Sequence, residues 1–119
     1  MSLTLNTRQV DGHIIVEASG QIEAGESCLQ LHEFAKRLIS GGGRFFVLDM
    51  AGISYMDSAG LGLLLSIYAT IRNQGGHLKL LNVGATVKEA LTITNLIQVF
   101  EIFEDEDRAI ASKSPGPAS

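Results

Sequence analysis

Apolar and polar positions along this chain alternate between the two-residue period of strands and the wider period of amphipathic helices. Two β-rich segments, residues 3–10 and 13–20, are separated by Asp11-Gly12, a dipeptide typical of a two-residue hairpin turn. Apolar residues then recur at helical spacing over residues 28–39, and the glycines at 41–43 end that helix. We therefore expect an antiparallel pair of strands followed by a helix.

The second half of the chain continues this alternation. Residues 44–50 are almost uniformly apolar, which is typical of a strand covered on both faces in the middle of a sheet. The elements expected after it are a helix over 58–73, a strand over 77–83, a helix ending near 95, a strand over 99–103 and a short helix over 105–112. Thr86 and Glu89 have the spacing of a capping box at the start of the third helix. This order predicts an α/β fold with parallel crossovers after the initial hairpin.

Length and composition favour one globular domain. The chain has 119 residues, of which 45% are hydrophobic and 18% charged, and it contains no internal repeat or linker. We expect a single domain over residues 1–112 and a disordered tail over 113–119, which has nothing apolar to bury. The N-terminus has no secretory signal, and the longest apolar run, residues 59–71, is shorter than the roughly 20 residues that span a bilayer. These features predict a soluble, cytoplasmic protein.

Charge and cysteine content exclude several classes of partner and cofactor. The formal net charge is −4, and no basic cluster is longer than Lys36-Arg37, so neither nucleic acid nor an anionic membrane is an expected partner. Cys28 is the only cysteine, which rules out an intramolecular disulfide, and we expect its thiol to be buried and inert. No spacing of His, Cys, Asp or Glu indicates a metal site, so no cofactor is expected.

The stretch YMDSAGLGLLL, residues 55–65, carries the candidate chemistry, but its catalytic motifs are incomplete. Met56 stands where a nucleophile elbow requires glycine, and Leu65 stands where a dinucleotide-binding loop requires its third glycine. No Walker motif is present, and nothing in the sequence places His13, His32 or His77 beside Ser58. A hydrolase that uses Ser58 is therefore the weakest of the functional hypotheses.

Asp49 is expected to end the apolar central strand, where a receiver domain carries its phosphoacceptor aspartate. That chemistry also needs an acidic pair after the first strand, and the segment RQVDGH (residues 8–13) has none. We interpret Asp49 as structural, with its carboxylate holding the loop after the strand by hydrogen bonds.

Ser58 has both a structural and a functional interpretation. Asp57 and Ser58 are both preferred helix N-cap residues, and capping alone would explain either one. However, at about 100° per residue, Ser58, Gly62, Ser66, Ala69 and Asn73 share one side of the predicted helix. The opposite side carries Leu61, Leu64, Ile67, Tyr68 and Ile71. A flat face of small residues favours close approach of a partner, and a phosphate on Ser58 would add about −1.5 to −2 charges there and expel that partner.

The segments FFVLDMAGISYMDSAGLGLLL and GGHLKLLNVGATVKEAL resemble the STAS domain family, and more narrowly its stand-alone bacterial anti-sigma factor antagonists. The resemblance covers residues 3–110 and implies a small mixed sheet with helices mainly on one face. It also implies that an anti-sigma factor, itself an ATP-dependent serine kinase, phosphorylates Ser58. The unphosphorylated antagonist would bind this kinase and so release a sigma factor. Phosphorylation would break the complex, and a phosphatase would restore it.

The resemblance also assigns a partner-binding surface. The segment GQIEAGES, residues 20–27, matches a stretch that lies beside the phosphorylation loop in the family, with Glu23 in place of the usual aspartate. The expected partner-binding residues are Glu23, Met56, Asp57, Ser58, Gly62, Ser66 and Ala69. We expect a non-enzymatic protein that is a monomer or weak dimer when free. The alternative is a constitutive STAS adaptor or scaffold subunit that is not phosphorylated.

Overall fold

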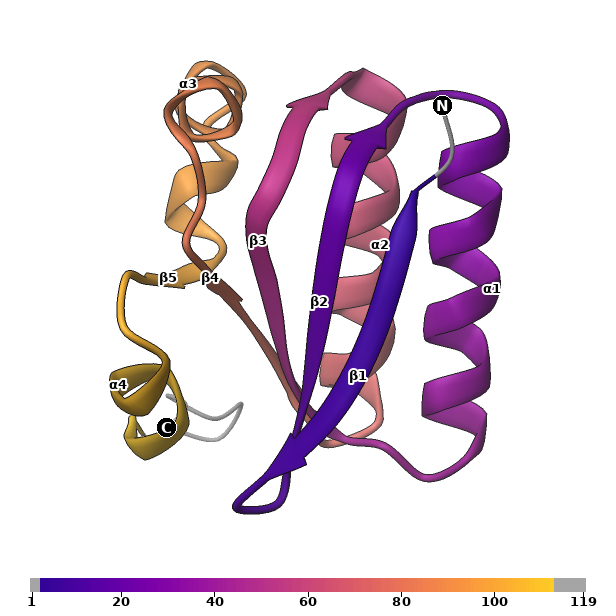
Figure 1. Cartoon of the computed structure of the whole chain (residues 1–119), viewed down its shortest axis with the longest axis vertical. Coiled ribbons are helices and arrows are strands. Elements are labelled where there is room, and N and C mark those ends of the chain that lie inside the picture. The colour runs from indigo at the N-terminus through magenta and orange to yellow at the C-terminus, as the bar shows by residue number, and fades with distance from the viewer. Residues whose placement is uncertain (1–2, 113–119) are drawn as a thin grey trace.

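A five-stranded sheet in the order β1-β2-β3-β4-β5 forms the centre of the protein (Figure 1). The structure is a computed structural model and describes residues 3–112. Its elements are β1 (Thr4–Val10), β2 (His13–Ile22), α1 (Glu26–Ser40), β3 (Phe45–Met56), α2 (Ser58–Asn73), β4 (His77–Leu81), α3 (Ala85–Ile93), the 3₁₀-helix η1 (Leu96–Gln98), β5 (Glu101–Phe103) and α4 (Glu106–Ala111). The predicted α/β class and the order of its elements are confirmed.

The strand directions follow from the connections between them. β1 and β2 are antiparallel, joined by a turn in which Asp11 and Gly12 have φ angles of 49° and 80°. Two left-handed residues are what the tight hairpin turn requires, so the interpretation of this dipeptide is confirmed. The remaining neighbours, β2 to β5, pair in parallel, because each crossover passes through a helix.

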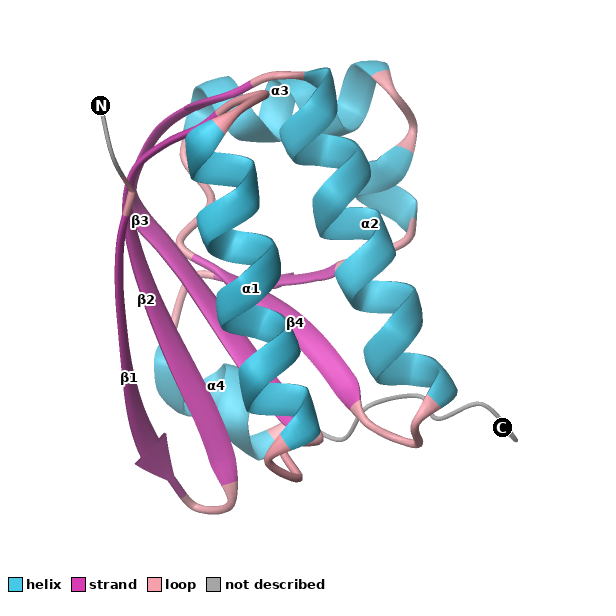
Figure 2. Ribbon diagram, turned by 90° about the vertical axis from the view of Figure 1, so that its right-hand side faces the viewer, coloured by secondary structure: helices cyan, strands magenta, loops and turns pink. Residues whose placement is uncertain are grey.

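Helices α1 and α2 lie side by side on one face of the sheet (Figure 2). Buried Leu31 of α1 and Leu64 of α2 join Phe46, Leu48 and Leu80 of the sheet in the main core. The short helix α4 lies on the opposite face, where a smaller cluster consists of Ile15, Val47, Leu81 and Ala109. The expectation of helices mainly on one face is therefore confirmed, with α4 covering part of the other.

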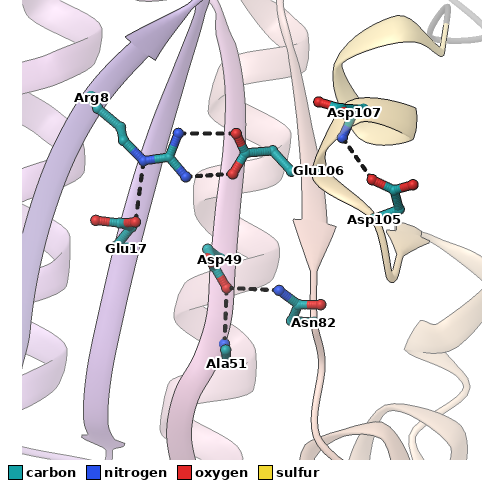
Figure 3. A network of polar contacts seen from close by, with 8 residues as sticks. All are labelled: Arg8, Glu17, Asp49, Ala51, Asn82, Asp105, Glu106 and Asp107. Carbon is teal, nitrogen blue, oxygen red and sulfur yellow. Dashed lines mark hydrogen bonds and ion pairs between the residues drawn. The ribbon is translucent and has the colours of Figure 1, made fainter.

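β3 is longer than predicted, and this corrects the placement of Asp49. The strand continues to Met56, and its last residues still pair with β2 up to Ile22. Two register irregularities interrupt this pairing, which breaks the apolar alternation by which a strand is recognised in sequence. Asp49 therefore lies within β3, not at its end. Its Oδ1 accepts hydrogen bonds from the Ala51 amide at 3.1 Å and from Asn82 Nδ2 at 3.4 Å (Figure 3).

The capping box predicted for the third helix is wrong. α3 begins at Ala85 with Gly84 as its N-cap, and no side chain caps it. Thr86 is already inside the first turn, so its hydroxyl is not at the N-cap position. The last strand is also shorter than predicted, because Leu96–Gln98 form a 3₁₀-helix after left-handed Asn95.

Cys28 is half-buried, not fully buried as expected, and packs against the edge of the main core. Desolvation, together with the nearby Asp57 carboxylate, raises the pKa of its thiol, which disfavours the reactive thiolate. Within residues 3–112, no helix has the length and apolar character needed to cross a membrane. The tail predicted over 113–119 lies outside the described residues.

Candidate functional site

Ser58 is the first residue of α2 and directly follows Asp57 at the carboxyl end of β3. Its side chain is exposed. Asp57 is the N-cap, and its Oδ1 accepts a hydrogen bond from the Gly60 amide at 2.9 Å. The choice left open by the sequence is thereby decided: Asp57 caps the helix, and Ser58 stands at its exposed N-terminal end.

The β2–α1 loop lies beside this helix start. The second oxygen of Asp57, Oδ2, accepts a hydrogen bond from the Ala24 amide at 2.9 Å. The Asp57 amide in turn donates to the carbonyl of Ile22 at 3.2 Å. The Ala24 amide, followed by the Gly60 amide, lowers the pKa of the Asp57 carboxyl, so this group remains ionised at neutral pH.

Ser27 holds the backbone of Glu23, a role that the sequence did not suggest. Ser27 is 5% exposed. Its hydroxyl accepts a hydrogen bond from the Glu23 amide at 2.8 Å and donates one to the Glu23 carbonyl at 3.0 Å. One feature of the sequence could have indicated this role. Ser27 lies in the first turn of α1, and the N-cap of this helix, Gly25, has no side chain that could cap it. Ser27 and Asp57 together fix the loop that carries Glu23.

Gly60 allows the first turn of α2 to approach the end of β2 closely. A Cβ at this position would lie 2.5 Å from the Ile22 carbonyl oxygen and 2.7 Å from Met56 Cγ. Gly62 differs, since a Cβ there would meet nothing within 4 Å. The helical spacing placed Gly62 on the exposed side of the helix, as the structure has it, but it gave no indication of the close approach at Gly60, because spacing alone does not show backbone proximity.

The face of small residues on α2 has the predicted orientation. Ser58, Gly62, Ser66, Ala69 and Asn73 are all exposed. On the opposite side of the helix, Leu61, Leu64 and Ile71 are buried in the main core. The structure therefore presents a strip of mostly small or polar side chains, which begins at Ser58, runs along α2 and includes the exposed Leu65.

Met56 does not belong to this surface. It is 5% exposed and lies in the main core, with its side chain near Gly60. Its expected role in partner binding is corrected, because a side chain enclosed by the core has no area left to contact another protein. Glu23 and Asp57 are half-buried and Gly62, Ser66 and Ala69 are exposed, so these residues remain available.

The histidines lie away from Ser58. His13 and His77 begin β2 and β4, at the opposite ends of the parallel strands from the β3–α2 junction, and His32 is exposed in the middle of α1. This geometry offers Ser58 no histidine base. Among residues 3–112, no group of three or more His, Cys, Asp or Glu side chains is arranged to hold a metal ion.

Residues 4–109 match the STAS domain, and the chain belongs to this family. It is similar to the anti-sigma F factor antagonist of Paenibacillus polymyxa, with 26% identity over 110 residues that cover 92% of this chain and 94% of the relative. It is also similar to the anti-sigma-B factor antagonist of Bacillus subtilis, with 29% identity over 102 residues that cover 86% of this chain and 92% of the relative.

Solved structures agree with the fold. An anti-sigma factor antagonist from Mycobacterium paratuberculosis superposes with a TM-score of 0.78 at 20% identity, covering 91% of both chains. The phosphorylated form of the Bacillus cell fate determinant SpoIIAA superposes with a TM-score of 0.70 at 19% identity, covering 90% of this chain and 96% of the other.

Proposed function

We propose that this protein is an anti-sigma factor antagonist controlled by phosphorylation of Ser58. One observation at the start of α2 carries the proposal. Asp57 caps the helix, and this leaves the exposed Ser58 hydroxyl available for modification. The names of the two curated relatives, matched over most of both chains, support the same assignment.

In this proposal the unphosphorylated protein binds an anti-sigma factor along α2 and the β2–α1 loop. Small side chains at Gly62, Ser66 and Ala69 would let a partner approach the helix closely, and Glu23 would lie at the rim of the contact. Burying such a face requires that no unpaired charge be trapped in it, because a desolvated charge without a partner is costly.

Phosphorylation would then act through charge. A phosphate on Ser58 would add about −1.5 to −2 charges beside the ionised Asp57. The free amides and positive dipole end of α2 would tolerate the group without unfolding the helix. A partner with its surface already fitted to α2 would meet an unpaired dianion and dissociate.

The partners follow from this cycle. The anti-sigma factor would be an ATP-dependent serine kinase, and a phosphatase would remove the phosphate from Ser58. We assign the protein no enzymatic activity of its own, no nucleic-acid partner and a place in the cytoplasm, as a monomer or weak dimer when free.

The test is phosphopeptide mapping after incubation with ATP and a lysate of the source bacterium, with Ser58→Ala as the control. Phosphate on the peptide that carries Ser58, lost in the variant, supports the switch. A lysate that phosphorylates other proteins but not Ser58 would contradict it and favour the constitutive adaptor.

A further inference from the structure

We propose that Asp57 is a positioning residue that joins the β2–α1 loop and the start of α2 into one docking surface. The inference rests on the proposed function for its consequence in binding. The joint, by which we mean the hydrogen bonds of the Asp57 carboxylate to both segments, is a property of the free protein and is tested separately.

The Asp57 carboxylate accepts hydrogen bonds from two separate segments of the chain. Asp57 Oδ1 accepts from the Gly60 amide of its own helix, and Oδ2 accepts from the Ala24 amide of the loop, each at 2.9 Å. Ala24 and Asp57 are 33 positions apart in sequence. Helix capping needs only the first of these hydrogen bonds, so the second has a different role.

Asp105 provides the internal comparison. It is the N-cap of α4, and its Oδ1 accepts from the Asp107 amide at 3.0 Å, within the helix that it caps. An aspartate cap in this protein therefore does not automatically reach a second segment, and the contact to Ala24 is specific to Asp57.

Two features of the β2–α1 loop explain why its backbone needs the contact with Asp57. Gly25 has a φ of 107° and caps α1 without a side chain, while Ala24 and Gly25 are both exposed. Ser27 fixes the backbone of Glu23 from the α1 side, and Asp57 fixes Ala24 from the α2 side. With both contacts made, the Glu23 backbone is held close to Ser58 before any partner arrives, which reduces the ordering cost of binding.

An ionised carboxylate accepts hydrogen bonds on both oxygens, whereas a protonated carboxyl presents an O–H donor on one of them. The hydrogen bonds from Ala24 and Gly60 lower the pKa of Asp57, consistent with an acceptor that is charged at neutral pH. An asparagine keeps one acceptor oxygen and is an equally good N-cap, but it turns a donating NH₂ group toward the second amide. Asp57→Asn thus separates capping from joining.

The experiment compares amide hydrogen exchange in the wild type, Asp57→Asn and the matched control Asp105→Asn. We expect the Ala24 amide to exchange roughly tenfold faster in Asp57→Asn, as for loss of a charge-assisted hydrogen bond, with Gly60 changed much less. Asp105→Asn should leave both amides unchanged. Asp57→Ser, which also caps with a single oxygen, gives a second variant in case the first folds poorly. Unchanged exchange at Ala24 in the folded variants would overturn the proposal.

The binding consequence is measured as the initial rate of Ser58 phosphorylation in the ATP-supplemented lysate at increasing concentrations of antagonist. A displaced docking loop should raise the apparent KM of Asp57→Asn several-fold with little change in maximal rate, whereas Asp105→Asn should match the wild type. Equal KM values for Asp57→Asn and wild type would show that the joint does not serve docking. If the wild type itself is not phosphorylated, the proposed function fails, and the exchange result still decides the joint.

Discussion

The guanidinium of Arg8 on β1 and the carboxylate of Glu106 on α4 form a two-point ion pair, although 98 positions separate them along the chain (Figure 3). Arg8 Nη1 donates to Glu106 Oε2 at 2.9 Å, and Arg8 Nε also donates to Glu17 Oε2 at 3.2 Å. The pair raises the pKa of Arg8 and lowers that of Glu106. It ties the last helix to the first strand across the face of the sheet that α1 and α2 leave open.

Glu106→Gln should loosen α4 without unfolding the domain. The amide side chain keeps one acceptor but loses the charge, so the bidentate geometry is lost. Because the pair is partly exposed to solvent, we expect little change in global stability and faster amide exchange confined to α4. Hydrogen exchange resolved by segment checks this, and equal exchange of α4 in variant and wild type would contradict it.

Lys79→Met should have a larger effect. Lys79 is 0% exposed, its Nζ donates to the Ala109 carbonyl at 2.7 Å and to that of Ser112, and the ammonium lies 5.6 Å from the centroid of the Phe103 ring. Methionine fills similar space but leaves these carbonyls without their donor. The expected loss in the free energy of unfolding is about 1–3 kcal/mol, measured by urea denaturation. A variant as stable as the wild type would show that α4 does not depend on this lysine.

Gly60→Ala and Gly62→Ala form a matched pair, because the two glycines are two residues apart near the start of α2 and differ in what surrounds them. A Cβ at Gly60 would press against the Ile22 carbonyl, so we expect a loss of about 1–3 kcal/mol. A Cβ at Gly62 meets open space, and the better helix propensity of alanine should add about 0.5–1 kcal/mol. Thermal denaturation of both variants checks the order, and the reverse order would refute the close approach at Gly60.

Acid should destabilise the protein through His77. Burial, followed by the charges of Lys79, His13 and Arg72, lowers the pKa of His77 to about 4. Its Nε2 is buried without a hydrogen-bond partner, and its ring contacts Phe45 and His13, with ring centroids 4.8 and 5.6 Å away. The folded state favours neutral His77, so its contribution to the free energy of unfolding is fully present above pH 6.5, the ordinary pKa of histidine. This contribution is lost as the pH drops from there toward the pKa of about 4 in the folded state. In His77→Phe the melting temperature should depend less on pH over this range than in the wild type. If the melting temperatures of variant and wild type fall in parallel as the pH drops, His77 is not the cause.

Ser58→Ala should leave stability almost unchanged, whereas Asp57→Ala should cost about 0.5–2 kcal/mol. The difference follows from the assignment of the cap, since only the aspartate side chain accepts from the Gly60 amide. Chemical denaturation of the two variants distinguishes them. Equal losses would indicate that the serine shares the capping role.

The sequence allowed the order of helices and strands, the hairpin at Asp11-Gly12 and the two faces of α2 to be predicted, because each depends on local periodicity or turn chemistry. The end of β3 was missed, since the irregular pairing of residues 51–56 hides their strand character. At the site, the burial of Met56 depends on how β2 approaches α2. The role of Gly60 depends on the same approach, which no spacing rule describes, whereas Ser27 acts on the Glu23 backbone four positions away.

The irregular pairing of β2 and β3 has a further consequence for how the length of this chain can vary. From Asp49 to Met56, β3 uses two more residues than the stretch of β2 from Glu17 to Ile22 that it accompanies. Each irregularity takes up one extra residue of β3, so Leu48, Ile53 and Met56 all face the main core although Ile53 is an odd number of positions from the other two. Loss or gain of a single residue at such an irregularity would therefore leave the facing of the residues beyond it, including Asp57 and Ser58, unchanged. Length changes in this segment are compatible with a working site in steps of one residue.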